Sequence, residues 1–146
     1  MKISDVLADK GGHVVTVWPD KRLDQVPLLF DERNIASVVV VNHADRPVGI
    51  VTDRELVRAL ARHGVAALEL PVSHVMLSPA PACAPNQSVG YVMRLMTESR
   101  VRHVLVMRDD KMVGIVSIGD LVKIRLSDAE MENRVLREMA LARLVT

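Results

Sequence analysis

The segment DRPVGIVT at residues 45–52 recurs later in the chain as DKMVGIVS at residues 110–117. At this offset of 65 residues, seven of the 13 positions from 45 to 57 are identical. Further upstream, residues 14–41 align without a gap with residues 80–107 at an offset of 66, with six identical positions. Such self-similarity indicates an internal repeat, so we infer two copies of one unit of roughly 65 residues.

Each copy shows the same order of expected elements: strand, helix, strand, strand, helix. The first copy predicts a strand at 15–17, a helix at 23–30 with Asp24 as its N-cap, strands at 37–41 and 48–51, and a helix at 53–62. The second copy predicts a strand at 82–83, a helix at 89–96, strands at 103–107 and 112–116, and a helix at 118–126. A unit of this size is marginal alone. We therefore expect an α+β fold in which two tandem β-α-β-β-α repeats, related by a pseudo-twofold axis, bury their apolar faces against each other.

This organisation divides the chain into three segments: a first repeat over 1–66, a second over 70–126, and a C-terminal tail over 127–146. In the tail, Met131, Val135 and Met139 follow helical spacing, which predicts an amphipathic helix. Ser127 precedes Glu130 by three residues, a spacing that would cap a new helix at this point. We expect the apolar stripe of the tail to be buried against a partner.

The composition excludes several classes of protein. The chain has 146 residues, a formal net charge of +1 and only one residue each of Trp, Tyr and Phe, so we expect no nucleic-acid partner. No apolar run approaches the ~18 residues of a membrane-spanning helix, and the first residues lack the apolar stretch of a secretion signal. The single cysteine excludes an internal disulfide and is consistent with a reducing cytosol. We therefore expect a cytoplasmic protein without a membrane partner.

Catalytic chemistry finds no support in the motifs. The five histidines show no close ligand spacing, and a single cysteine excludes a cysteine-built zinc site, so no metal is expected. No Gly-rich phosphate loop and no nucleophile with a matched base is present. We expect a protein that is not an enzyme and that uses no catalytic cofactor.

The helix start that follows the repeated segment carries the same pattern in both copies. Thr52 precedes Glu55 by three residues, as Ser117 precedes Asp120. One interpretation is a capping box, in which the hydroxyl and the carboxylate satisfy free backbone N–H groups. The other is a ligand site, because a helix N-terminus suits a phosphate and an exposed acid can accept both hydroxyls of a ribose. The two interpretations are compatible.

Basic residues distinguish the two copies. Arg102 and His103 begin the second buried strand, where the first copy has Ala36 and Ser37. One interpretation is that both residues lie at a solvated strand end. The other is that one or both point at the phosphates of a ligand, because a guanidinium group matches the geometry of phosphate oxygens. Arg54, near the first helix start, is a solvated helix position or a source of positive charge for the first site.

The repeated pattern resembles a pair of CBS domains. In this family the end of the unit reads Gly, two residues, Thr or Ser, two residues, an acid and an aliphatic residue, which both copies match from Gly49 and from Gly114. The basic pair before the second strand is similar as well. The chain departs from the family pattern in two ways. Val39 and Leu105 stand where the family commonly has a proline in the second strand, and Glu55 stands in the first copy where aspartate is usual.

The resemblance implies a regulatory protein with two clefts for an adenosine derivative: AMP, ADP, ATP, NAD(H) or S-adenosylmethionine. It also implies that the acid, Asp120 or Glu55, holds the ribose and that Ser117 or Thr52 lies near the sugar-phosphate. The adenine would enter an apolar slot, for which the candidates are Val17, Val38, Cys83 and Val104. Ordinary core packing is the alternative for each of these four residues. The resemblance further implies a homodimer and an effector protein regulated in trans.

A second hypothesis is a dimerising protein-interaction module with vestigial clefts. Glu55 and the missing prolines favour it, because they depart from the family pattern. The intact Ser117 and Asp120, together with the pair at 102–103, favour nucleotide binding.

Overall fold

The structure, a computed structural model, describes residues 1–145. Its helices and strands in chain order are α1 (Ile3–Lys10), β1 (Thr16–Val17), α2 (Val26–Arg33), β2 (Ser37–Val41), β3 (Pro47–Thr52), α3 (Asp53–His63), β4 (Ala82–Cys83), α4 (Val89–Ser99), β5 (His103–Arg108), β6 (Lys111–Ser117) and α5 (Ile118–Val145). Short 3-10 helices cover Leu23–Gln25, Gly64–Glu69 and Val72–His74. The expected strand–helix–strand–strand–helix order is confirmed in both copies.

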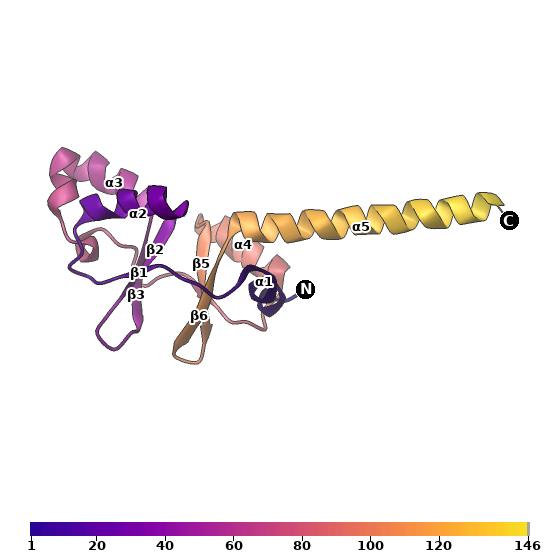
Figure 1. The fold of residues 1–146 in the computed structure, drawn as a ribbon, viewed down its shortest axis with the longest axis horizontal. Coiled ribbons are helices and arrows are strands. Elements are labelled where there is room, and N and C mark those ends of the chain that lie inside the picture. The colour runs from indigo at the N-terminus through magenta and orange to yellow at the C-terminus, as the bar shows by residue number, and fades with distance from the viewer. Residues whose placement is uncertain (146) are drawn as a thin grey trace.

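Two three-stranded sheets of the same topology stand side by side (Figure 1). In each sheet the middle strand pairs in parallel with the short first strand and antiparallel with the third. The middle strands are paired at equivalent positions, Val39 with Ile50 and Leu105 with Ile115. The antiparallel pairing places the start of each middle strand beside the end of the third strand, where the following helix begins.

Each middle strand is covered on both faces, as its apolar run predicts. Because side chains alternate along a strand, Val38 and Val40 of β2 pack beneath the helices of the first half, and Val104 and Val106 of β5 do so in the second. A third core lies between the two sheets. It is formed by Val39, Val41, Ile50, Leu105 and Ile115.

The two halves exchange their leading segments. Ile3 and Val6 of α1 are buried in the core of the second half, together with Val89 of α4. Conversely, Val72 of the 3-10 turn at the start of the second repeat is buried in the core of the first half. The expected boundaries at 66 and 70 therefore describe the sequence repeat, whereas each packed core draws residues from both repeats.

Two helix starts differ from the expectation. Asp24 does not cap α2; it lies in a 3-10 turn and pairs with Arg22 at 2.9 Å, and α2 begins after Gln25 with Pro27 in its first turn. No new helix starts at Ser127, because α5 continues without a break from Ile118 to Val145. The i to i−4 hydrogen bonds of a continuing helix already use the backbone groups that Ser127 would cap.

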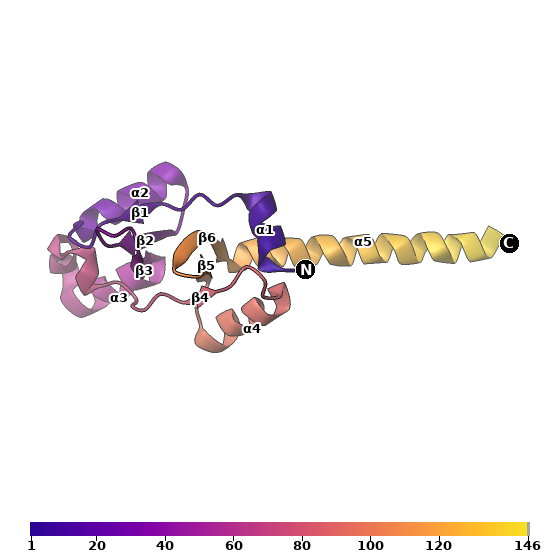
Figure 2. The same cartoon turned by 90° about the horizontal axis from the view of Figure 1, so that it is seen from below.

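The second half of α5 projects away from the rest of the molecule. Figures 1 and 2 show the helix leaving the second sheet beside α1 and extending well beyond the body. Leu121 in its first turn is fully buried, whereas every residue from Arg125 to Val145 is exposed.

Candidate functional site: an arginine-lined cavity between the repeats

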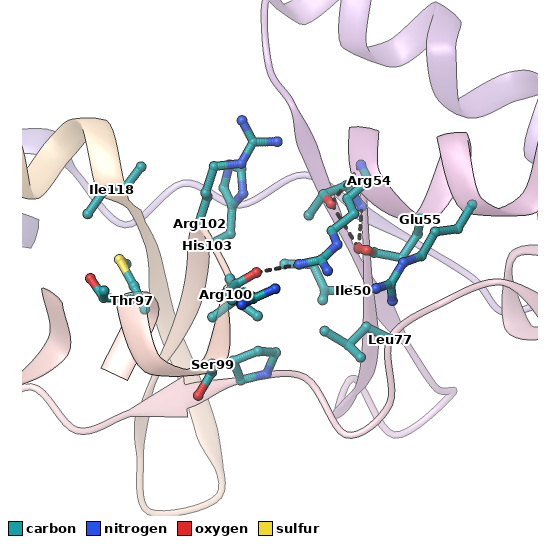
Figure 3. Close-up of a pocket in the computed structure, with 15 residues that line it drawn as sticks. Ile50, Arg54, Glu55, Leu77, Thr97, Ser99, Arg100, Arg102, His103 and Ile118 are labelled. Carbon is teal, nitrogen blue, oxygen red and sulfur yellow. Dashed lines mark hydrogen bonds between the residues drawn. The ribbon is translucent and has the colours of Figure 1, made fainter. Parts of the chain in front are cut away.

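A cavity of about 500 Å³ lies where the two halves meet. The first half contributes the end of β3 and the start of α3, and the second contributes the segment from Met96 to His103 and the start of α5. The linker between the repeats closes one side with Leu77 and Pro81. Figure 3 shows the side chains of the two halves facing each other across this space. A ligand in the cavity would contact both repeats.

The helix α3 begins at the cavity with the predicted capping box. The Thr52 hydroxyl accepts a hydrogen bond from the Arg54 backbone N–H at 3.2 Å, and a Glu55 oxygen accepts from the Thr52 backbone N–H at 3.0 Å. The Thr52 hydroxyl also donates to Glu55 at 2.8 Å. Glu55 is only 7% exposed, so its carboxylate is committed to this helix start. The capping interpretation is therefore confirmed at this helix.

Two contacts cross the cavity rim between the halves. The Arg102 guanidinium donates to both carboxylate oxygens of Asp53, at 2.9 and 3.0 Å. The Arg54 guanidinium donates to the backbone carbonyl of Arg100 (Figure 3). Both side chains of the Arg102–Asp53 pair are about half exposed, and exposed pairs are worth ~1 kcal/mol or less. Arg102 is therefore held at the rim by a pair that a stronger anion can replace.

His103 lies on the cavity wall beside Arg102. Burial lowers the pKa of the imidazole, and the positive charge of Arg102 lowers it further. The pKa therefore lies below the ordinary value of about 6.5, which favours the neutral imidazole. An anion bound here would favour the protonated form and raise this pKa.

Arg58 and Arg100 also line the cavity and were missed by sequence reasoning. With Arg54 and Arg102 they place four guanidinium groups around one space. Arg58 lies one helical turn after Arg54 on α3, so helical spacing gave a signal for it once α3 was known. Arg100 ends α4 in a left-handed conformation, and nothing in the sequence pointed to that turn.

The second capping box lies apart from this cavity. The Ser117 backbone N–H donates to Asp120 at 2.8 Å, and the Asp120 N–H donates to the Ser117 hydroxyl at 3.2 Å, as predicted. Neither residue lines the cavity. Arg102 and His103 lie beside both helix starts: His103 pairs with Ser117 in the sheet, the Arg102 carbonyl accepts from the Ile118 backbone N–H at 2.8 Å, and the cavity adds the Thr52 helix start on the other side.

The Asp120 carboxylate of the second capping box forms an ion pair with Lys10 of α1. Its ammonium group donates to Asp120 at 2.6 Å and to the carbonyl of Ile115 at 2.9 Å. Partial burial opposes ionisation of Asp120, but the hydrogen bonds from Lys10 and Ser117 prevail and hold the pKa of this carboxyl below its usual range. A ribose would have to displace Lys10 from this acid.

The four residues proposed for an adenine slot lie elsewhere. Val17 and Val38 are buried in the helix-facing core of the first half, and Cys83 and Val104 in that of the second. None of them lines the cavity, so the core alternative holds for all four. The residues of β2 and β5 that point between the sheets are one position further along. Burial also raises the pKa of the Cys83 thiol to about 11, which leaves the thiol protonated and unreactive.

Residues 1–145 contain neither a metal-ion cluster nor a membrane-spanning helix. Within this range, no three His, Cys, Asp or Glu side chains are grouped so that they could hold a metal ion. No helix in the same range has both the length and the apolar character needed to cross a membrane.

Known proteins match this chain over most of its length. The family model for the CBS domain matches twice, at residues 3–62 and 72–127. A mitochondrial CBS domain-containing protein of Arabidopsis thaliana is 32% identical over 129 residues, covering 83% of this chain. The chain spans 63% of the length of that relative.

Solved structures share the fold. A CBS-domain containing protein from Agrobacterium tumefaciens is 38% identical, with a TM-score of 0.82 over 85% of this chain and 92% of its own. A CBS domain pair solved with 5'-methylthioadenosine and S-adenosyl-L-methionine is 19% identical, with a TM-score of 0.77 over 88% of this chain and 98% of its own. Because both repeats match the family model and the two-sheet architecture is shared, this chain belongs to the CBS domain family, as a tandem pair.

Proposed function

We propose that this protein is a regulatory module that binds an adenosine nucleotide, of the class AMP, ADP, ATP or NAD(H), in the arginine-lined cavity and acts on a partner protein in trans. The observation that carries the proposal is the cavity itself, which joins both repeats and combines four arginines with apolar walls. Its volume of about 500 Å³ lies within the range of roughly 300–1,000 Å³ that small-molecule sites occupy.

The charge of the cavity suits phosphate. Arg54, Arg58, Arg100 and Arg102 face Glu55, whose carboxylate is already engaged by Thr52. The backbone N–H groups at the start of α3 add positive potential, because a helix N-terminus carries partial positive charge. Guanidinium groups bind phosphate oxygens in a two-pronged geometry and remain charged at any physiological pH. The phosphate end of a nucleotide therefore has its recognition groups here.

The apolar wall suits a nucleobase. Ile50 and Leu77 line the first-half side of the cavity, Ile118 lines the second-half side, and Pro81 adds an apolar residue from the linker. The structural neighbour solved with 5'-methylthioadenosine and S-adenosyl-L-methionine holds two ligands that share an adenosine moiety. This supports adenosine as the common part of the ligand.

Regulation would follow from the position of the cavity. A ligand that contacts both halves stabilises the relative arrangement in which its two sets of contacts are made together, and this shifts the population toward that arrangement. We assign no catalytic step to the site, and the bound nucleotide serves as a signal. The output would reach an effector protein through the surface that this arrangement presents.

Calorimetric titration tests the proposal. Nucleotide-stripped protein is titrated with adenosine, AMP, ATP, NAD(H) and S-adenosylmethionine, and the same ligands are titrated into an Arg58→Ala, Arg100→Ala double variant. We expect saturable binding by at least one phosphate-bearing ligand and clear weakening in the variant, with adenosine less affected. Absence of heat from every ligand, confirmed by unchanged melting temperatures, would refute the nucleotide function.

One observation favours the alternative of a dimerising interaction module with vestigial clefts. The acid of each repeat is already satisfied within the protein, Glu55 by Thr52 and Asp120 by Lys10. If the protein is such an interaction module, it binds no nucleotide and its dimerisation does not depend on nucleotide. Sedimentation of the same protein samples with and without ligand distinguishes the two functions.

A further inference from the structure

The projecting part of α5 carries large apolar side chains that are exposed to solvent. Leu126 is 58% exposed and Leu136 is 57% exposed. The helix has 28 residues, and from Arg125 onward none is buried. A solvent-surrounded helix gains little stability from its backbone alone, because most helical stability in proteins comes from packing of one face. The row of apolar residues on this helix therefore identifies a contact surface.

One row of α5 follows the seven-residue repeat of a coiled coil. The a and d positions of a heptad are alternately four and three residues apart. On α5 the a positions are Leu126, Asn133 and Ala140, and the d positions are Val122, Ala129 and Leu136. We call this row the heptad face. All six residues are exposed, and five of them are apolar. A single asparagine at an a position is a known device for setting the register and number of strands of a coiled coil.

The heptad face is free of the protein body. The contacts of α5 with the body involve Leu121, which is fully buried, Ile118 and Ile124, which pack against the same core, Asp120, which pairs with Lys10, and the Arg125 guanidinium, which lies against Gly90 of α4. At 3.6 residues per turn, the centre of the heptad face lies roughly a quarter of a turn around the helix from these contacts. Beyond Arg125, where every described residue of α5 is exposed, the heptad face is open to a second helix.

The charges beside the heptad face are complementary to a second copy of the same helix in parallel orientation. In a parallel pair, each g position meets the e position five residues later on the partner. Arg125 and Glu132 occupy g positions, and Glu130 and Arg137 occupy the matching e positions. Both kinds of contact, Arg125 with Glu130 and Glu132 with Arg137, join opposite charges, and the symmetry of the pair makes each of them twice.

We propose that the α5 helices of two copies of this chain form a parallel two-stranded coiled coil through the heptad face. In this parallel arrangement Asn133 of one chain contacts Asn133 of the second copy. An antiparallel pair does not allow this contact, because it places a positions opposite d positions. The proposal does not depend on nucleotide binding.

The stripe that the sequence predicted for burial is a different row. Met131, Val135 and Met139 lie on another side of α5 and are exposed as well. A heptad drawn through Met131 and Val135 places Asp128 and Glu138 at core positions, where two like charges would be buried against their counterparts. The heptad face has no charged residue between Val122 and Ala140, so it is the better contact surface.

Cysteine cross-linking tests the geometry in the full chain. Leu126→Cys and Leu136→Cys place thiols on the heptad face, and Val135→Cys places one on the stripe beside it, with the buried Cys83 present in all three. We expect both heptad-face variants to form disulfide-linked dimers on oxidation and Val135→Cys to remain monomeric on a denaturing gel. An antiparallel pair can align at most one of the two heptad-face positions with itself, so cross-linking of only one overturns the parallel arrangement. Cross-linking of Val135→Cys alone, or of none, overturns the proposal.

A charge exchange tests the pairing without new thiols. Glu132→Arg replaces two attractive contacts with two repulsive ones, which should raise the dimer dissociation constant about tenfold in sedimentation equilibrium. Adding Arg137→Glu to this variant restores opposite charges and should recover the wild-type constant. A dimer that is insensitive to both variants assembles through another surface and refutes the proposal, as does a wild-type chain that stays monomeric.

Discussion

Substitution of the two members of the Arg102–Asp53 pair should change ligand affinity in opposite directions. Arg102 donates to both oxygens of Asp53 at 2.9 and 3.0 Å across the junction of the repeats. If Arg102 binds phosphate, Asp53 competes with the ligand for the same guanidinium. Arg102→Ala then removes a ligand contact, whereas Asp53→Asn removes a competitor and a negative charge near the phosphate.

The magnitudes follow from the exposure of the pair. A hydrogen bond to a charged group is worth about 1.5–3 kcal/mol, so Arg102→Ala should weaken binding roughly ten- to a hundredfold. The side chains are 60% and 49% exposed, and such a pair is worth at most ~1 kcal/mol. Asp53→Asn should therefore strengthen binding by no more than about fivefold. For the same reason neither variant should lower the free energy of unfolding by more than ~1 kcal/mol.

Calorimetry with AMP and with adenosine is the assay, and chemical denaturation checks the fold. Adenosine is the internal control, because it lacks the phosphate and should bind both variants and the wild type alike. Equal weakening of AMP binding by both variants would mean that the pair serves only to hold the two halves together. Parallel losses for adenosine and AMP would refute phosphate recognition by Arg102.

Three further outcomes follow from the structure. Because the pKa of His103 is lowered in the free protein and a bound anion would raise it, NAD should bind more tightly as the solution becomes more acidic, and His103→Asn should flatten this dependence in calorimetry; an unchanged dependence in the variant would contradict a role for His103. The pKa of Asp120 is lowered by Lys10 despite partial burial, so this pair stabilises the fold above pH ~4 and its contribution is lost as pH falls below. Lys10→Met should thus lower the free energy of unfolding by ~1 kcal/mol or less at pH 7 and by a smaller amount at pH 2.5, where the contact with the Ile115 carbonyl remains; an equal loss at both values would contradict the assignment. Ile3→Ala should lower the free energy of unfolding by about 2–5 kcal/mol and speed amide hydrogen exchange in β5. Val72→Ala should speed amide hydrogen exchange in β2 instead, and the reverse pattern would refute the exchanged packing.

The local part of the fold was predictable from the sequence. The bounds of β2, Ser37–Val41, agree with the expectation, and the other strands agree within one or two residues. Both capping boxes were predicted from three-residue spacing. These features depend on neighbours along the chain, where residue type and spacing determine the hydrogen bonds directly. The repeat itself is likewise a property of the sequence alone.

The orientation of the buried strands was not predictable. The run from Val38 to Val41 is apolar at every position, so it carries no alternation that would tell one face from the other. Val38 was proposed to contact the ligand and faces the helices, whereas Val39 faces the space between the sheets. Only the packing of the second half against the first distinguishes the two faces.

The grouping of the charged residues was not predictable either, because the contacts join residues far apart in the chain. Arg102 meets Asp53 across 49 positions, and Lys10 meets Asp120 across 110. Sequence reasoning assigned each acid and each basic pair to its own repeat. The exchange of leading segments brings the Lys10 end of α1 to the second sheet, which no local signal indicates.

This exchange makes the two helix starts chemically unequal. Ile50 and Ile115 occupy equivalent positions of β3 and β6. The carbonyl of Ile50 accepts from the backbone N–H of Leu77 at 2.9 Å, whereas that of Ile115 accepts from the Lys10 ammonium at the same distance. In the first case the donor is neutral backbone beside a cavity of about 500 Å³.

In the second case the donor brings a positive charge that pairs with Asp120 and occupies the acid where a ribose would bind. A nucleotide binding at the second helix start must break a hydrogen-bonded ion pair of 2.6 Å, which is shorter and less exposed than the Arg102–Asp53 pair that a phosphate displaces in the cavity. The cavity also has the four arginines, whereas Asp120 is neutralised by Lys10. The physical argument therefore favours one strong site for each chain, in the cavity beside α3, and a calorimetric stoichiometry of two equal sites would contradict it.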